Sequence, residues 1–215
     1  MKDNNRVTSM LFCSPPLLNR EAEVLAEIEV QRTQLRHRLV EPRRWLGSLR
    51  RLSLARAIQG SNSIEGYDAA LDDAAAVAMG EEPLDVGEET RLALQGYRDA
   101  MTYVLQLAAE ADFQYDKRLF KSLHFMMTGH RLDTRPGLWR IGDIYVRRGE
   151  TGEVVYEGAE VDHLPGLMEA LALTLNQDDG SGPVVRAGMA HLNLVMVHPF
   201  KDGNGRMARC LQSLV

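Results

Sequence analysis

Nine consecutive residues near the carboxyl end of the chain carry groups that handle phosphate. The run from His198 to Arg206 reads His-Pro-Phe-Lys-Asp-Gly-Asn-Gly-Arg, and Arg209 follows within one helical turn. His198 titrates near neutrality and suits a general base, whereas Asp202 offers a carboxylate oxygen of the kind that Mg²⁺ takes together with phosphate oxygens. The two arginines would share a helix face and present planar forks to phosphate. The run therefore predicts a site that holds a polyphosphate and its metal while a hydroxyl loses its proton.

The backbone around this run is predicted to break between two helices. Residues 184–197 form an apolar stretch compatible with a helix, and Pro199 disfavours helix at the residue before it. The Gly-Asn-Gly of residues 203–205 tolerates dihedral angles closed to most residues, and residues 206–215 resume a helical period. A glycine-rich turn that opens a helix presents free backbone N–H groups to an anion. The phenylalanine of the run is expected to bury its ring and fix the loop.

Together with Arg209, this run resembles the motif of the Fic family (the Fic/Doc fold) and matches every fixed position of its strict form. The resemblance implies transfer of AMP from ATP, with Mg²⁺, to a hydroxyl side chain of a target protein. It implies His198 as the base and Asp202 as the metal ligand. The residues that it implies for nucleotide binding are Phe200, Lys201, Asp202, Gly203, Asn204, Gly205, Arg206 and Arg209. Kinases of the Doc type replace the second glycine and the arginine after it, so Gly205 and Arg206 favour the branch that transfers AMP.

A second motif lies far upstream, in the run Ser61-Asn-Ser-Ile-Glu65-Gly66. By residue types alone it is a polar turn with one carboxylate, which favours a simple loop at the end of a helix. It also resembles the inhibitory motif of the Fic family, in which Ser or Thr is followed, after three residues, by Glu and then by Gly or Asn. The resemblance implies that Glu65 pairs with Arg209, which would otherwise hold the γ-phosphate of ATP, and so restrains the enzyme.

The rest of the chain is predicted to be mainly α-helical. Helix-favouring composition and amphipathic spacing mark the segments 17–40, 46–59 with Gly60 as its end, 68–79, 88–110, 117–128 and 163–176. Two short β-prone runs, 144–147 and 153–156, flank a glycine-containing loop and predict a hairpin. The expected fold class is mainly α, a Fic-type helical bundle with one short β-hairpin. The resemblance makes that hairpin a flap beside the active site, where a target chain adds as a strand.

Two regions are expected along the chain. Residues 1–50 form an N-terminal helical region without a readable motif, and residues 51–215 form the Fic domain. The parts expected within that domain are an inhibitory helix over 52–66, the flap over 143–158 and the catalytic loop over 198–206. The last helix runs to the final residue without a glycine or proline stop, so the natural protein is expected to continue.

Composition favours a globular protein of the reducing cytoplasm. Of the 215 residues 45% are hydrophobic, and the net charge of −5 with dispersed Lys and Arg argues against a nucleic-acid surface. No apolar run approaches the roughly 20 residues of a membrane span. Cys13 and Cys210 are isolated thiols, as expected without disulfides, and no histidine pair has zinc-ligand spacing. We expect Cys210 to be a small buried hydrophobe.

Three functions are consistent with these features. The first is a self-restrained protein adenylyltransferase that uses Mg²⁺ and ATP and modifies a Tyr, Thr or Ser hydroxyl of a target protein, as well as itself. The second is removal of AMP from a modified target, with Glu65 activating a water, or another nucleotidyl or phospho-transfer reaction. The third is a nucleotide-sensing or DNA-associated regulator without turnover, against which the intact His198 weighs. The motif does not fix the donor base, so UTP, GTP and CDP-choline stay open, as does a homodimer.

Overall fold

The computed structural model describes residues 11–39, 44–149 and 151–215. The α-helices in these residues are α1 (Asn19–Leu39), α2 (Arg44–Ser63), α3 (Leu71–Met79), α4 (Glu88–Leu107), α5 (Lys117–Thr128), α6 (Leu164–Asn176), α7 (Pro183–Val197) and α8 (Asn204–Leu214). Strands β1 (Tyr145–Arg147) and β2 (Val154–Glu157) form one antiparallel hairpin, which opens with Tyr145 opposite Glu157. The predicted fold class, mainly α with one short hairpin, is confirmed.

One predicted helix end is wrong, because Gly60 does not terminate α2. The helix continues to Ser63, and the chain turns instead around Gly66, whose φ is 86°. An interior glycine costs a helix about 1 kcal/mol, and the packing of α2 against α3 and α4 offsets that cost. The other predicted helices differ by one to three residues at some ends. Residues 1–10 and 40–43 of the predicted N-terminal region lie outside the described residues.

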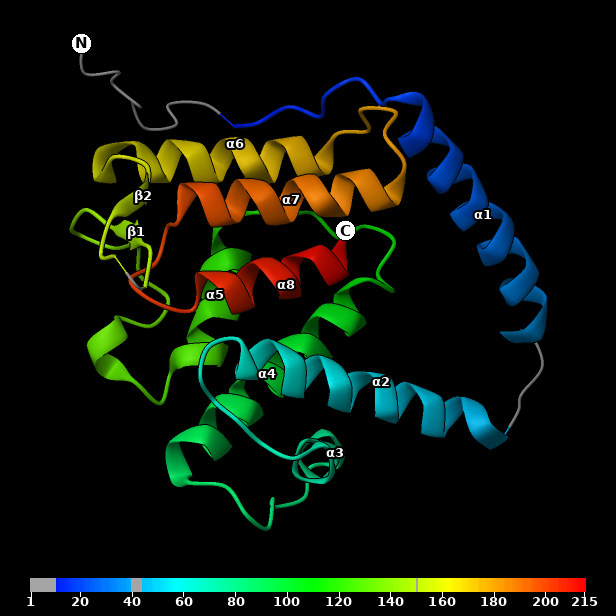
Figure 1. Ribbon diagram of the computed structural model, residues 1–215, viewed down its shortest axis with the longest axis horizontal. Helices are drawn as coiled ribbons and strands as arrows, with labels where there is room; N and C mark the ends of the chain where they lie inside the picture. Colours follow the sequence, from blue (N-terminus) through cyan, green and yellow to red (C-terminus); the bar gives the residue numbers. More distant parts are fainter. Residues whose placement is uncertain (1–10, 40–43, 150) are drawn as a thin grey trace.

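Helix α8 is the centre of the bundle. It packs against α7 on one side and against α4, α5 and α2 on the other, while α6 covers α7. Figure 1 shows this arrangement, with α6 and α7 side by side above α8, and with α2, α3 and α4 below it. The fully buried side chains of α8 include Met207, Ala208, Cys210 and Leu211. Burial raises the pKa of the Cys210 thiol to about 12, so this cysteine is the inert hydrophobe that was predicted.

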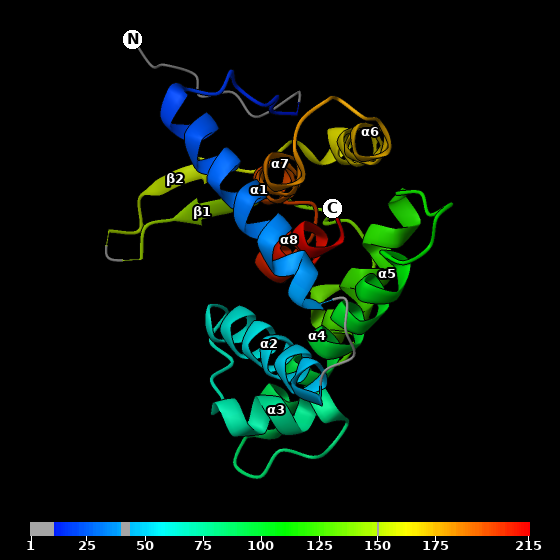
Figure 2. The ribbon, with the colours of Figure 1, turned by 90° about the vertical axis from the view of Figure 1, so that its right-hand side faces the viewer.

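The amino-terminal part of the described chain lies at the edge of the bundle. Helix α1 stands along one side in Figure 1, and Figure 2 views the molecule from that side. The extended segment before it is held by Asn193 of α7, whose Oδ1 accepts from Phe12 N at 2.7 Å and whose Nδ2 donates to Phe12 O at 3.0 Å. No described helix is both long and apolar enough to cross a membrane.

Replacement of two helix glycines by alanine is predicted to change the free energy of unfolding in opposite directions. A Cβ on Gly96 of α4 would lie 2.5 Å from Met126 O and 3.0 Å from Met127 O, so this glycine permits the close crossing of α4 and α5. A Cβ on Gly60 of α2 would meet no heavy atom within 4 Å. We expect Gly96→Ala to lower the unfolding free energy by about 1–3 kcal/mol through overpacking and Gly60→Ala to raise it by about 0.5–1 kcal/mol. Denaturant unfolding checks both, and changes of the same sign would contradict the packing described.

Candidate functional site

The motif loop joins α7 to α8 through a break in the backbone. His198 caps α7 with φ 51° and ψ 58°, and its N–H donates to Leu194 O at 3.0 Å. This left-handed conformation costs most residues about 1–2 kcal/mol, and it turns the chain out of the helix at the predicted place. Gly203, with φ 74°, is then the N-cap of α8.

Two buried side chains of the motif hold the loop closed. Asn204 Oδ1 accepts from Phe200 N at 3.0 Å, and Asn204 Nδ2 donates to Phe200 O at 2.8 Å. The Phe200 ring stacks on His124 with 3.8 Å between ring centroids and contacts Trp139 at 5.0 Å. The predicted anchoring role of Phe200 is confirmed. Because the Asn204 amide is engaged at both ends, contact of this residue with a nucleotide is left to its backbone N–H.

His124 of α5 is a loop-holding residue that the sequence did not reveal. Its Nδ1 accepts from Gly137 N at 2.9 Å, so the ring is the tautomer whose Nε2–H donates to Asp202 O at 3.0 Å. Burial lowers the pKa of His124 to about 4, which keeps it neutral near pH 7. One signal was present in the sequence, a histidine on the buried face of an amphipathic helix, where a polar ring needs partners.

The ring of His198 is in the tautomer that leaves Nε2 able to accept a proton. Its Nδ1 lies 3.1 Å from Val195 O, so Nδ1 carries the hydrogen and Nε2 carries the lone pair. Burial lowers the pKa of His198, with the Arg140 charge acting in the same direction. The neutral form therefore dominates near pH 7, as a general base requires.

Arg140 joins the hairpin to the motif loop. Its side chain is 4% exposed and donates to His198 O at 2.8 Å, to Gly142 O at 2.8 Å and to Ala159 O. Gly158, at the base of β2, comes so close that an added Cβ would lie 3.4 Å from the Cβ of His198. These contacts place the hairpin beside His198, as predicted for a flap.

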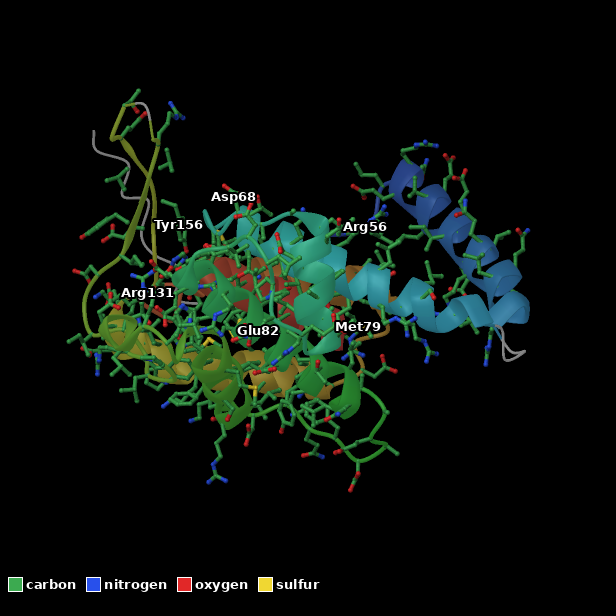
Figure 3. All side chains as sticks on the ribbon, turned by 90° about the horizontal axis from the view of Figure 1, so that it is seen from below. Arg56, Asp68, Met79, Glu82, Arg131 and Tyr156 are labelled. Atoms are coloured by element: carbon green, nitrogen blue, oxygen red, sulfur yellow. The ribbon has the colours of Figure 1, made fainter. Side chains whose placement is uncertain are left out.

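Tyr156 supports the hairpin from the other side, through a hydrogen bond from its hydroxyl to Met196 O of α7. In Figure 3 Tyr156 and Arg131 are labelled at the end of the molecule from which the hairpin projects. Two of the carbonyl groups that Arg140 binds belong to residues 19 and 58 positions further along the chain, so no local sequence pattern signalled its role.

Arg206 is a buried cation with two guanidinium nitrogens that lack hydrogen-bond partners among the described residues. The residue is 1% exposed, and its Nε and Nη1 have no hydrogen-bond partner in the part of the chain that the structure describes. The Tyr67 ring lies over the guanidinium, 5.0 Å from its central carbon. An unpaired charge away from water is costly, and the first turn of α8 adds backbone N–H groups without intrahelical acceptors. This combination suits an anion such as phosphate.

Asp202 is partly exposed and is paired with an arginine that the sequence did not single out. Its Oδ2 lies 3.1 Å from Arg131 Nη1, and its Oδ1 accepts from Gly203 N at 2.7 Å. The described residues contain no group of three or more His, Cys, Asp or Glu side chains able to hold a metal. A divalent ion at Asp202 would therefore take most of its ligands from phosphate and water, as Mg²⁺ commonly does. Lys201 points elsewhere and donates to Asp133 O at 2.8 Å.

Glu65 and Arg209 form the pair that was predicted from the upstream motif. Arg209 Nη2 lies 2.8 Å from Glu65 Oε1, and both side chains are 23% exposed. Arg209 also donates from Nε to Ser61 Oγ at 2.8 Å and from Nη2 to Ser61 O at 3.0 Å. Gly205 makes room for this contact, because a Cβ there would collide with Glu65 Oε1. The end of α2 is thus fastened to the face of α8 that starts at the glycine turn.

The buried His124 predicts a pH dependence of stability. Between pH 6.5 and about 4 the unfolded chain binds a proton that the folded chain does not, so the unfolding free energy falls as the pH falls through this window. Replacement by His124→Gln should flatten that part of the profile. In a histidine-resolved NMR titration His124 should stay neutral until near pH 4, and a midpoint between pH 6 and 7 would contradict the tautomer assigned above.

The carboxyl-terminal half of the chain has known relatives. Residues 114–215 match the Fic/DOC family. Protein adenylyltransferase fic-1 of Caenorhabditis elegans is 36% identical over 95 residues, which are 43% of this chain and 17% of that protein. Protein adenylyltransferase Fic of Drosophila virilis is 35% identical over 97 residues, which are 42% of this chain and 18% of that protein. The chain thus spans less than a fifth of the length of these relatives.

Solved structures share the fold over most of the chain. A Fic family protein from Desulfovibrio desulfuricans G20 has a TM-score of 0.74 and 24% identity, over 94% of this chain and 59% of that one. Fic-1 from Caenorhabditis elegans has a TM-score of 0.66 and 22% identity, over 91% of this chain and 59% of that one. These two structures show that the fold is shared, whereas the family match and the relatives in sequence give the conclusion: residues 114–215 of this chain match the Fic/DOC family.

Proposed function

We propose that this chain is a Fic-type protein adenylyltransferase that transfers AMP from ATP to a hydroxyl of a target protein and is restrained by Glu65. The observation that carries the proposal is the buried Arg206 guanidinium, whose Nε and Nη1 lack partners in the described chain at the start of α8. The site lies inside the segment that matches the Fic/DOC family. Two relatives of that segment are named protein adenylyltransferases.

The domain is proposed to begin before that segment, at about residue 51. Helices α2 and α3 pack against α4, and α2 reaches α8 directly. Ser61 and Glu65 each hold Arg209. Since these contacts bring upstream residues to the motif helix, we treat residues 51–215 as one functional unit.

Each residue of the loop has a part in the proposed reaction. The Nε2 lone pair of His198 accepts the proton of the attacking hydroxyl, whose oxygen bonds to the α-phosphorus of ATP. The bond between that phosphorus and the bridging oxygen breaks, and pyrophosphate leaves. Arg206 and the N–H groups at the start of α8 bind the phosphate oxygens. Asp202 would hold Mg²⁺, which supplies positive charge to the phosphates when bound.

The contact between Glu65 and Arg209 supports the proposed restraint. A carboxylate on a guanidinium makes a charge-assisted hydrogen bond, and here the two atoms are 2.8 Å apart. A γ-phosphate that approaches Arg209 meets the negative charge of Glu65 and loses its own partner. The nucleotide then binds with its α-phosphate out of line with the hydroxyl, and a misplacement of about 1 Å can cost 10²-fold in rate.

The hairpin is the proposed docking place for the target. In the described residues its sheet has two strands, so each strand has an outer edge, and Val154 and Val155 are exposed on β2. An extended target segment can add to such an edge through main-chain hydrogen bonds, which would present its Tyr, Thr or Ser hydroxyl near His198. Self-modification, a homodimer and a cytoplasmic location stay predictions.

The reverse reaction and other donors use the same residues. Glu65 is a partly buried carboxylate next to the phosphate-binding turn, where it could activate water to remove AMP from a modified target. Incubation with a pre-modified target separates the two directions. Parallel labelling with ATP, GTP, UTP and CDP-choline identifies the donor. A regulator without turnover is disfavoured by the base-ready tautomer of His198.

The first prediction for this function concerns the base. In a Glu65→Gly background, His198→Ala should lower transfer by about 10²–10⁴-fold while ATP binding is retained, because His198 lies outside the phosphate-binding turn. Labelling from α-³²P-ATP measures transfer, and calorimetry measures binding. His191→Ala is the matched control, since that histidine is on α7 and pairs with Gln212. Normal labelling by the His198 variant would remove it from the mechanism.

The second prediction concerns the restraint. Glu65→Gly should raise labelling of the protein itself and of targets by about 10²-fold, because Arg209 is freed for the γ-phosphate. Arg209→Ala should not reproduce this gain, since it also removes the phosphate contact. Glu81→Gly changes an exposed carboxylate after α3 and serves as the control. Equal low activity of wild type and Glu65→Gly, with folding and ATP binding intact, would rule out inhibition by Glu65.

A further inference from the structure

Tyr67 follows the inhibitory motif directly and contacts two arginines of the site. Its ring lies over the Arg206 guanidinium at 5.0 Å. Its hydroxyl oxygen accepts a hydrogen bond from Arg131 Nη1 at 3.1 Å. Tyr67 thus covers the buried cation proposed to bind phosphate and also holds the arginine next to it.

Arg131 is in turn bound to the carboxylate proposed to hold the metal. The same Nη1 atom that donates to Tyr67 lies 3.1 Å from Asp202 Oδ2. Asp133 lies 3.3 Å from Nη2, and Glu89 lies 3.8 Å from Nε. Arg131 therefore lies among three carboxylates and a phenol, of which only Asp202 belongs to the motif loop.

A guanidinium and a divalent cation compete for one carboxylate. Both are positive, both bind the carboxylate oxygens, and Mg²⁺ requires its oxygens at about 2.0–2.1 Å. With Arg131 on Oδ2 and the Gly203 N–H on Oδ1, both oxygens of Asp202 already have partners. A metal that approaches Asp202 must displace Arg131 or face its repulsion.

The segment from Ser61 to Tyr67 is tied together by its own backbone. The N–H groups of Glu65 and Tyr67 donate to the same carbonyl, Asn62 O, at 2.9 and 3.0 Å. Asn62 is fully buried, and its amide also donates to Ile58 O at 2.8 Å. Movement of Glu65 would therefore be expected to move Tyr67 as well.

We propose that Tyr67 and Arg131 form a second restraint on the site, in which Arg131 competes with the metal for Asp202 and Tyr67 couples that competition to the inhibitory segment. One segment then holds three arginines. Ser61 and Glu65 hold Arg209, while Tyr67 covers Arg206 and binds Arg131. The inference rests on the proposed function, since it takes Asp202 as the metal ligand. It implies that Glu65→Gly alone leaves part of the restraint in place.

The experiment measures ATP affinity by calorimetry on the full chain, once with Mg²⁺ and once with EDTA. The dissociation constant in EDTA divided by that with Mg²⁺ is the ratio of interest. It reports how much the metal contributes to ATP affinity, without any turnover. Arg131→Gln should increase this ratio by about 2–5-fold, the worth of a partly exposed ion pair. Tyr67→Phe removes only the hydroxyl and should give a smaller change of the same sign. It also keeps the test available if Arg131→Gln does not fold.

Three further variants serve as controls for the measured ratio. Asp202→Asn should lower the ratio, and in the double variant with Arg131→Gln the gain should vanish. Arg148→Gln, on the exposed hairpin where Arg148 pairs with Glu153, should leave the ratio unchanged.

These variants distinguish the metal role of Asp202 from the competition by Arg131. If Asp202→Asn leaves the ratio unchanged, the metal role in the proposed function is wrong. If Asp202→Asn lowers it but neither Arg131→Gln nor Tyr67→Phe raises it, the second restraint alone is wrong. Weaker ATP binding by Arg131→Gln in EDTA would make Arg131 a phosphate ligand and would also overturn the competition proposed.

Discussion

The unpaired charge of Arg206 is the constraint on which the rest of this structure depends. A guanidinium that is 1% exposed, with two nitrogens lacking partners in the described chain, is unfavourable unless an anion binds beside it. Its surroundings reduce that cost without neutralising the charge, because the Tyr67 ring lies over it and supplies only a weak attraction. The fold therefore holds an unneutralised guanidinium at the start of α8, where the helix dipole also favours a negative ligand.

Groups that can touch a substrate and groups that hold the loop are different residues. His198, Asp202, Arg206 and Arg209 present reactive or charged atoms, whereas the loop that positions them is held by the neutral side chains of Asn204 and His124 and by Arg140 from outside the loop. Asn204 binds both backbone groups of Phe200, and His124 spans from Gly137 to Asp202 O. A neutral histidine suits this task, since it can accept from one side of the loop and donate to the other.

The upstream segment reaches the site because α2 runs past Gly60. One further turn of helix carries Ser61 to Arg209, and the turn at Gly66 then places Glu65 and Tyr67 against separate arginines. The absence of a side chain at Gly205 gives the Glu65 carboxylate its approach. The glycine of the motif thus serves two needs, an open helix start for an anion and space for the carboxylate that opposes it.

The sequence by itself determined the residues of the motif, the break at His198, the hairpin and most of the helices, because these follow from local spacing, proline and glycine chemistry and amphipathic period. It also predicted the Glu65–Arg209 pair through a family resemblance. The wrong end of α2 shows the limit of local signals, since packing against α3 and α4 outweighed the cost of an interior glycine. Only the tertiary structure revealed His124, Arg140, Arg131 and Tyr67 at the site. The partners that bring them to the site lie 13 to 139 residues away, and no periodicity records which buried polar groups the fold will bring together.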